Sequence, residues 1–109
     1  MTSSRCVKEV RAAGVKITER EFMSQVSQLA RMLGYEVFHP WLSIHSERGF
    51  PDLTIWKPGL FILAELKSDT GKLSPSQIEK LDSLKGCGKV EVFLWRPADW
   101  DNIVKLLEG

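Results

Sequence analysis

The sequence predicts a single α/β domain in which helices flank a small mixed β-sheet. Its length of 109 residues fits one domain, and its composition, 43% hydrophobic and 27% charged, is that of an ordinary globular protein. Segments with helical periodicity alternate with short strand-like runs, which predicts the order α-β-β-β-α-β-α. The last strand follows its predecessor through a helix. Such a crossover joins parallel strands, so the sheet is expected to be mixed.

The first predicted helix begins after Thr18. Thr18 and Glu21 fit a capping box, in which each side chain accepts a hydrogen bond from the backbone of the other. Apolar residues follow at helical spacing as far as Leu33. Gly34 is a residue type that ends helices, so the helix is expected to stop there.

Two more helices are predicted in the second half of the chain. Ser74 is the expected N-cap of the first, with Gln77 in the capping-box position, and Asp99 is expected to cap the final helix. The apolar face of the Ser74 helix is predicted to consist of Ile78, Leu81 and Leu84. The predicted strands cover residues 35–39, 52–56, 60–66 and 90–95.

The turn Pro58-Gly59 predicts a hairpin with two carboxylates at its open end. If these two residues form the turn, paired positions sum to 117, and Asp52 lies directly opposite Glu65. Like charges at opposed positions are destabilising, and a bridging divalent cation is the usual reason for such a pair. A shift of one residue in register would place the two carboxylates on opposite faces.

Lys67 is predicted to share the face of Glu65, because strand side chains alternate with a period of two. Aspartate, glutamate and lysine together can bind Mg²⁺ or Mn²⁺ and position an attacking water. The alternative is a solvent-exposed hairpin end with a glutamate–lysine pair of little consequence. The spacing alone leaves both interpretations open.

The charge balance excludes a protein that binds nucleic acid by bulk charge alone. The formal net charge is +1, and no apolar run approaches the roughly 20 residues that span a membrane.

The two cysteines, Cys6 and Cys87, are too few for a disulfide framework, so a reducing, cytoplasmic setting is expected. Residues 1–16 are predicted to form a basic arm, or a frayed solvated terminus, ahead of a folded domain at 17–109.

Residues 49–53 and 65–67, Gly-Phe-Pro-Asp-Leu and Glu-Leu-Lys, resemble the PD-(D/E)XK nuclease motif. More narrowly, Gly-Lys-Leu-Ser-Pro-Ser-Gln at 71–77 and Trp-Arg-Pro-Ala-Asp-Trp at 95–100 look like the VRR-NUC branch of that superfamily. The resemblance runs from about residue 18 to residue 107 and implies a restriction-endonuclease-like fold. It also implies a metal-dependent enzyme that hydrolyses DNA phosphodiester bonds.

The resemblance implies roles for five residues of the hairpin and the following helix. Asp52 and Glu65 would ligate Mg²⁺ or Mn²⁺, with the Leu66 carbonyl as a further ligand. Lys67 would act on the attacking water. Gln77 matches a glutamine that family members carry at the start of the second helix. Since one side chain is not expected to serve both the site and the capping box, the site role is favoured over the cap.

Family members also carry a glutamate on the first helix, and Glu19 and Glu21 are both candidates. Glu21 is better explained as the capping partner of Thr18, which makes Glu19 the predicted site residue. Its alternative role is that of an acid at a helix N-terminus. The loop before Asp52 is predicted to meet the DNA backbone through Ser43, His45, Ser46 and Arg48.

The expected substrate is branched, flapped or junction DNA, because a lone domain of this size has little surface for reading sequence. Symmetrical cleavage of a junction needs two sites, which predicts a homodimer. Stand-alone nucleases of this kind are common in phage and mobile elements, so a phage origin in a bacterial host is expected by analogy. The alternatives are a catalytically silent DNA-binding or protein-interaction module and a metal-dependent hydrolase of a small phosphorylated substrate.

Overall fold

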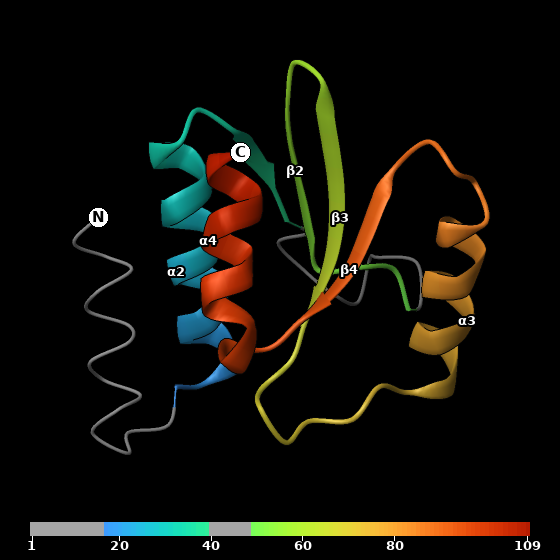
Figure 1. Cartoon of the computed structure of the whole chain (residues 1–109). Coiled ribbons are helices and arrows are strands. Elements are labelled where there is room, and N and C mark those ends of the chain that lie inside the picture. Colours follow the sequence, from blue (N-terminus) through green and yellow to red (C-terminus); the bar gives the residue numbers. More distant parts are fainter. Residues whose placement is uncertain (1–16, 40–48) are drawn as a thin grey trace.

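The computed structural model describes residues 17–39 and 49–109 (Figure 1). The predicted element order α-β-β-β-α-β-α is confirmed, with one added 3₁₀ turn before the last helix. No helix in these two ranges is long and apolar enough to cross a membrane. In chain order the elements are α2 (Glu19–Met32), β1 (Glu36–Phe38), β2 (Leu53–Lys57), β3 (Leu60–Leu66), α3 (Pro75–Lys85), β4 (Glu91–Trp95), η2 (Pro97–Asp99) and α4 (Trp100–Glu108).

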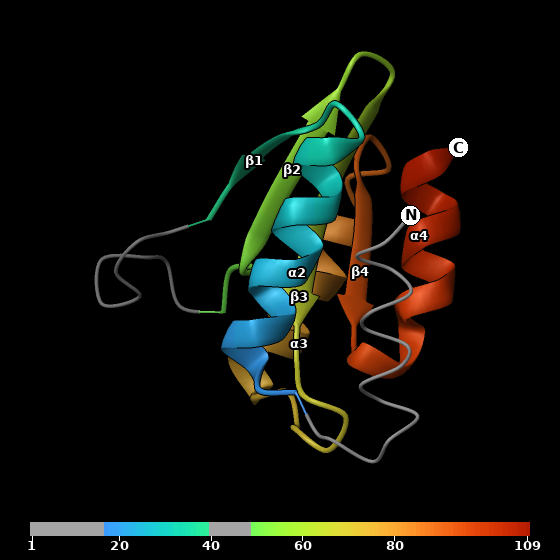
Figure 2. The same ribbon diagram turned by 90° about the vertical axis from the view of Figure 1, so that its left-hand side faces the viewer.

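The four strands form one mixed sheet in the order β1-β2-β3-β4. The β1–β2 and β2–β3 pairs are antiparallel, and β3–β4 is the expected parallel pair. Helices α2 and α4 cover one face of the sheet, and α3 lies on the other (Figures 1 and 2). The main core lies under α2 and α4 and includes Phe22, Val26, Leu29, Leu53, Ile55, Ile62, Leu66, Trp100, Ile103 and Leu107.

The predicted hairpin register is confirmed by the pairing of Leu53 with Ala64 and of Ile55 with Ile62. Gly59 has a φ of +89°, the left-handed conformation that the second central residue of a type II turn requires. This register places the even-numbered side chains Ile62 and Ala64 of β3 under α2 and α4. Glu65 is one position out of phase with them along the strand. Glu65 therefore faces the α3 side of the sheet.

Both predicted capping boxes are present. In α2, Thr18 N–H donates to Glu21 (2.9 Å) and Glu21 N–H donates to Thr18 Oγ1 (3.0 Å). In α3, the same pair of bonds joins Ser74 and Gln77. These caps satisfy backbone N–H groups that have no partner within the helix, which fixes where each helix begins.

Two expectations for the later helices were wrong. Asp99 occupies the expected N-cap position of α4, but its side chain does not cap the helix; its Oδ2 accepts from Arg96 N–H (2.9 Å) and closes η2 instead. The Asp99 carboxylate bonds to the turn that precedes α4, because Pro97 starts the 3₁₀ helix η2 there and Asp99 is its third residue. On α3, Leu81 is buried but Ile78 is 47% exposed, since this short helix covers only part of its sheet face.

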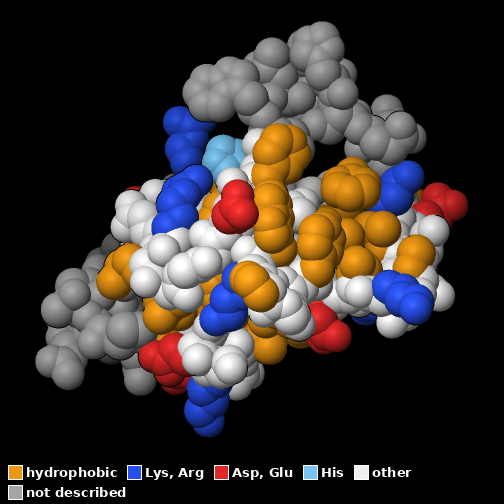
Figure 3. All heavy atoms as spheres, turned by 90° about the horizontal axis from the view of Figure 1, so that it is seen from above, with side chains coloured by type: hydrophobic (Ala, Val, Ile, Leu, Met, Phe, Trp, Pro, Cys, Tyr) orange, Lys and Arg blue, Asp and Glu red, His pale blue; other side chains and the backbone are white. Residues whose placement is uncertain are grey.

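Hydrophobic side chains remain exposed at the end of the molecule that carries the β2–β3 turn (Figure 3). Phe61, close to this turn, is 42% exposed. Phe38, at the end of β1 that is farther from the turn, is 58% exposed and lies on the same α3 side of the sheet. Phe61 also stacks on Trp56, with ring centroids 6.1 Å apart. Exposed apolar clusters of this kind often mark interaction surfaces.

Candidate active site

Four of the predicted site residues meet at one end of the sheet, on the side of α3. Asp52 lies one residue before β2, Glu65 is near the end of β3, and Lys67 follows β3. Gln77 comes from the first turn of α3, which the chain brings over this end of the sheet. Three separate segments therefore contribute to one cluster, as the PD-(D/E)XK resemblance implied.

Asp52 is fixed by a backbone hydrogen bond across the hairpin. Its Oδ2 accepts from the N–H of Leu66 at 3.0 Å. The β2–β3 ladder begins at Leu53, so Asp52 continues the register just beyond the last paired residue. The expected proximity of Asp52 to Glu65 is thus built by the hairpin itself.

Glu65 is the most deeply buried charged residue described, with 1% of its surface exposed. Its Oε2 accepts from Gln77 Nε2 at 2.8 Å and lies 4.0 Å from Lys67 Nζ. Its Oε1 is buried and has no hydrogen-bond partner. A buried carboxylate oxygen without a partner is rare, because it loses its hydration with no replacement. The reading of this hairpin end as a solvent-exposed salt bridge is therefore wrong.

The electrostatics of Glu65 match this burial. Burial raises its pKa from the ordinary 4.5 to about 8, and the nearby negative charge of Asp52 adds to the increase. The charge of Lys67 opposes this increase, whereas the charge of Glu19 adds to it. In the absence of a cation, Glu65 therefore holds a proton at neutral pH.

The residues present fit a divalent cation. Asp52 and Glu65 supply hard oxygen donors, and the orphaned Oε1 of Glu65 gives a donor that no protein group uses. Mg²⁺ is commonly held by only one or two carboxylates, with the remaining ligands from water and substrate phosphates. Residues 17–39 and 49–109 contain no group of three or more His, Cys, Asp or Glu side chains that could hold a metal. The protein thus supplies only part of the ligands that the cation needs, and water and a substrate phosphate would supply the others.

The expectation that Gln77 cannot serve both the cap and the site was wrong. Its Oε1 accepts from Ser74 N–H at 2.8 Å, while its Nε2 donates to Glu65 Oε2 at 2.8 Å. A primary amide has an acceptor and two donors on separate atoms, so one side chain makes both bonds. Gln77 therefore ties the start of α3 to the buried carboxylate.

Replacing Gln77 by glutamate should separate these two roles. Gln77→Glu keeps an oxygen for the Ser74 cap but places a carboxylate beside Glu65, so we expect a large loss of any cleavage activity with little loss of helix α3. Glu21→Gln makes the reverse exchange in the α2 capping box and is the matched control, with activity expected to stay near wild type. Cleavage rates and thermal unfolding of both variants measure this. Wild-type cleavage by a folded Gln77→Glu protein would contradict the site role.

The raised pKa of Glu65 predicts that metal-free protein loses stability with increasing pH. Between about pH 4.5 and pH 8 the folded protein binds more protons than the unfolded chain. This contribution to stability is fully present below about pH 4.5 and is lost as the pH rises through about 8. Thermal unfolding in EDTA should show a lower Tm at pH 8 than at pH 5. Glu65→Gln cannot ionise, so its Tm should fall less over the same interval; an equal fall would contradict the assignment.

The two candidate glutamates of α2 are placed differently. Glu21 is exposed and occupied by the cap, where the hydrogen bonds with Thr18 lower its pKa. Glu19 is also exposed, but its charge acts on Glu65. The arrangement thus supports Glu19 as the residue on the side of the site. The predicted DNA-contacting residues Ser43, His45, Ser46 and Arg48 lie outside the described residues.

Sequence reasoning assigned no task to Arg96, which holds the loop after Lys67. Its guanidinium donates to the carbonyls of Ser68 and Gly71, both at 2.7 Å. Asp69 in the same loop accepts from Ala98 N–H at 2.9 Å. The Arg-Pro pair within residues 95–100 was the only signal in the sequence, and its partners are backbone groups that no side-chain pattern reveals.

Gly49 has a similar positioning role at the start of the motif segment. Its φ is +80°, and a Cβ at this position would collide with the backbone carbonyl of Ser76. Only glycine allows the chain before Asp52 to pass so close to the first turn of α3. The approach of these two segments brings Gln77 within reach of Glu65.

A mixed sheet with helices on both faces, carrying aspartate, glutamate and lysine at the open end of a hairpin, defines the PD-(D/E)XK class of nuclease folds. The chain belongs to the VRR-NUC domain family, whose sequence profile matches residues 6–98. None of the curated protein sequences matches the chain significantly. The family resemblance and the fold class expected from the sequence are confirmed.

Several solved structures share this fold. One VRR-NUC domain protein superposes with a TM-score of 0.65 at 18% identity, covering 85% of this chain and 87% of the other. A second VRR-NUC domain gives 0.66 at 22% identity, covering 82% and 97%. The Holliday junction resolvase Hjc from Archaeoglobus fulgidus gives 0.53 at 18% identity, covering 71% and 67%. At these identities the likeness concerns the fold.

Proposed function

We propose that this VRR-NUC domain is a metal-dependent DNA nuclease that hydrolyses phosphodiester bonds, with a preference for branched, flapped or junction DNA. The observation that carries the proposal is the buried Glu65, whose Oε1 is orphaned beside Asp52 and whose Oε2 lies 4.0 Å from Lys67 Nζ. Burying such a group is costly for folding alone, whereas it is useful for holding a cation. Family membership supports the same activity.

Each residue of the cluster has a distinct task in this proposal. Asp52, Glu65 and the Leu66 carbonyl would hold Mg²⁺ or Mn²⁺. When bound, such a cation supplies an acidified water and neutralises charge on the phosphate. Lys67 positions the attacking water and stabilises negative charge that develops on the phosphoryl oxygens. Gln77 fixes the Glu65 carboxylate through its amide nitrogen.

The preference for structured DNA rests on size and likeness. A lone domain has little surface with which to read a base sequence, and a protein described as a Holliday junction resolvase shares the fold. Symmetrical cleavage of a junction needs two sites, so we propose a homodimer. The exposed Phe38 and Phe61 supply an apolar surface that a second copy can cover. Residues 1–16 would act as a basic arm on phosphates, ahead of the nuclease domain at 17–109.

The proposal is tested with linear duplex, flapped and four-way DNA, each with Mn²⁺ or EDTA, with sedimentation giving the oligomeric state. We expect Mn²⁺-dependent cleavage, fastest on the flapped or four-way substrates. Equal rates on all three would remove the structural preference and leave the nuclease. Binding without cleavage under every condition would identify a catalytically silent module instead.

The two glutamates of α2 should respond differently to substitution. Glu19→Gln is expected to slow cleavage with little change in stability, because Glu19 is the one of these two glutamates whose charge acts on Glu65. Glu21→Ala is expected to lower the stability modestly, because it removes one bond of the capping box, and to leave cleavage by the folded protein near wild type. Denaturant unfolding and cleavage rates measure both effects. The reverse pattern would assign the site role to Glu21.

A further inference from the structure

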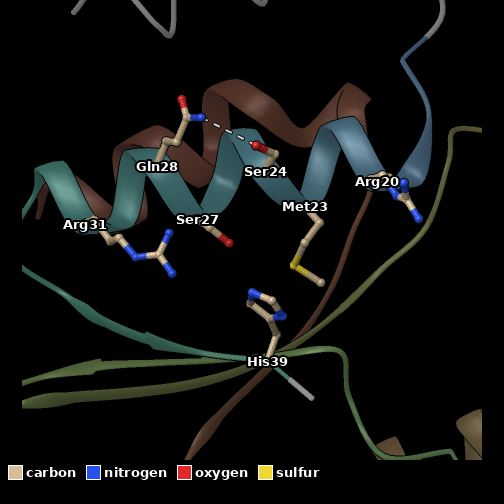
Figure 4. A pocket seen from close by; sticks show the side chains of 7 residues that line it. All are labelled: Arg20, Met23, Ser24, Ser27, Gln28, Arg31 and His39. Atoms are coloured by element: carbon tan, nitrogen blue, oxygen red, sulfur yellow. Dashed lines mark hydrogen bonds between the residues drawn. The ribbon is translucent and has the colours of Figure 1, made fainter. Parts of the chain in front are cut away.

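A groove of about 610 Å³ lies between α2 and the end of β1, on the side of the sheet opposite α3 (Figure 4). Helix α2 forms one wall, with Arg20 near its first turn and Arg31 in its last turn. His39, directly after β1, faces the helix from the other wall. None of the predicted catalytic residues lines this groove.

The charged side chains among the described residues that line the groove are both arginines. Arg20 and Arg31 line it together with His39, and no aspartate or glutamate of residues 17–39 and 49–109 does. Within residues 17–39 and 49–109, no carboxylate forms an ion pair with either guanidinium. A concave surface lined by cations without a local counter-charge concentrates field lines and attracts anions.

Ser27 gives an independent indication of a ligand. Its side chain is directed from α2 toward the groove and His39 (Figure 4). Ser27 is only 4% exposed, and its Oγ is buried with no hydrogen-bond partner. A hydroxyl left in this state has lost its water without gaining a protein partner, which is unfavourable. An acceptor oxygen in the groove would satisfy it.

We propose that this groove binds a backbone phosphate of the nucleic acid that flanks the bond being cleaved. A phosphate presents several acceptor oxygens, and guanidinium groups bind such oxygens through paired, charge-assisted hydrogen bonds. The Ser27 hydroxyl and the His39 ring supply further donors. Backbone phosphates are the groups that most often meet arginine, serine and other polar side chains in protein–DNA interfaces. The inference deepens the proposed function and rests on it.

The position of the groove fits a phosphate remote from the cleaved bond. The N-terminal end of α2 lies at the same end of the sheet as the end of β3, where the active site is (Figures 1 and 2). From Arg20 to Arg31 the helix rises by about 16 Å, at 1.5 Å per residue. One DNA strand advances about 3.4 Å per phosphate, so along a strand parallel to α2 Arg31 would lie several phosphates from Arg20.

The test measures binding of a fluorescently labelled flapped duplex in Ca²⁺ by anisotropy, so that no turnover is needed. Arg31→Gln and Ser27→Ala are expected to raise the Kd by about three- to tenfold, since about 1.4 kcal/mol is tenfold. Arg31→Gln should also reduce the salt dependence of binding by about one counterion. Lys105→Gln removes an exposed lysine on α4, outside the groove, and is the matched control with a smaller expected effect.

Stability separates a binding role of Ser27 from a structural one. Removing an unsatisfied hydroxyl should leave the Tm of Ser27→Ala at or above wild type, so weaker binding would not reflect poorer folding. Inorganic phosphate, titrated into the wild-type protein, should shift the NMR signals of His39 and Arg31. Phosphate shifts without any effect of the variants on DNA affinity would assign the groove to another phosphorylated ligand and overturn the proposal.

The outcomes also distinguish this inference from the proposed nuclease activity. If the protein binds DNA through the groove but cleaves nothing, the groove stands and the nuclease assignment fails. If it cleaves DNA while Arg31→Gln and Ser27→Ala bind like wild type or like Lys105→Gln, the nuclease stands and the groove inference is overturned.

Discussion

Lys67→Ala should bind DNA nearly as tightly as the wild-type protein in Ca²⁺ but cleave it about 10²–10³-fold more slowly in Mn²⁺. Losing one preorganised electrostatic group at a transition state typically costs a factor of this size. In the ground state the lysine is one cation among several, so its loss should weaken binding only slightly. Its Nζ lies 4.0 Å from Glu65 Oε2, which places its charge at the proposed reaction site.

Lys67→Met is the control for packing, because it keeps the apolar stem without the ammonium. Single-turnover cleavage and anisotropy binding should give the same result for both variants. Cleavage at the wild-type rate would show that the PD-(D/E)XK interpretation of the hairpin is wrong. A proportional loss of binding and cleavage would make Lys67 a phosphate anchor and favour a silent binding module.

Asp52→Asn should lower the affinity for Mn²⁺ by more than about 100-fold and remove cleavage. Even the loss of a group that only hydrogen-bonds to a metal ligand lowers metal affinity or activity by about 10–100-fold. Loss of a ligand's own charge should lower the metal affinity further. The asparagine carbonyl can still accept from Leu66 N–H, so the hairpin end should keep its shape. The pKa of Glu65 should also fall toward its ordinary value, because the neighbouring negative charge is gone.

Calorimetry with Mn²⁺ measures the Asp52 effect, and Asp82→Asn on the exposed surface of α3 is the matched control. Asp82→Asn should bind Mn²⁺ and cleave like wild type. Equal Mn²⁺ affinity for wild type and Asp52→Asn would refute the two-carboxylate site. It would leave the orphaned Oε1 of Glu65 without its proposed ligand.

Local sequence determined where the elements begin and how the hairpin pairs. The Thr18–Glu21 capping box involves residues three positions apart, so the sequence alone contains both partners. Pro58-Gly59 fixed the register in the same way, because a two-residue turn leaves one pairing that sums to 117. From this register the proximity of Asp52, Glu65 and Lys67 followed directly.

Contacts between distant segments decided the properties of the site. Burial of Glu65 depends on α3 lying over the end of the sheet, where Gln77 bonds to it. Gly49 leaves room for the first turn of α3 to pass close to the segment before Asp52. Arg96 binds backbone carbonyls 25 and 28 residues away. The α2–β1 groove likewise joins side chains that no spacing in the sequence relates. Residue types and short spacings specify local hydrogen bonds, whereas burial, and with it the raised pKa of Glu65, arises from packing of the whole chain.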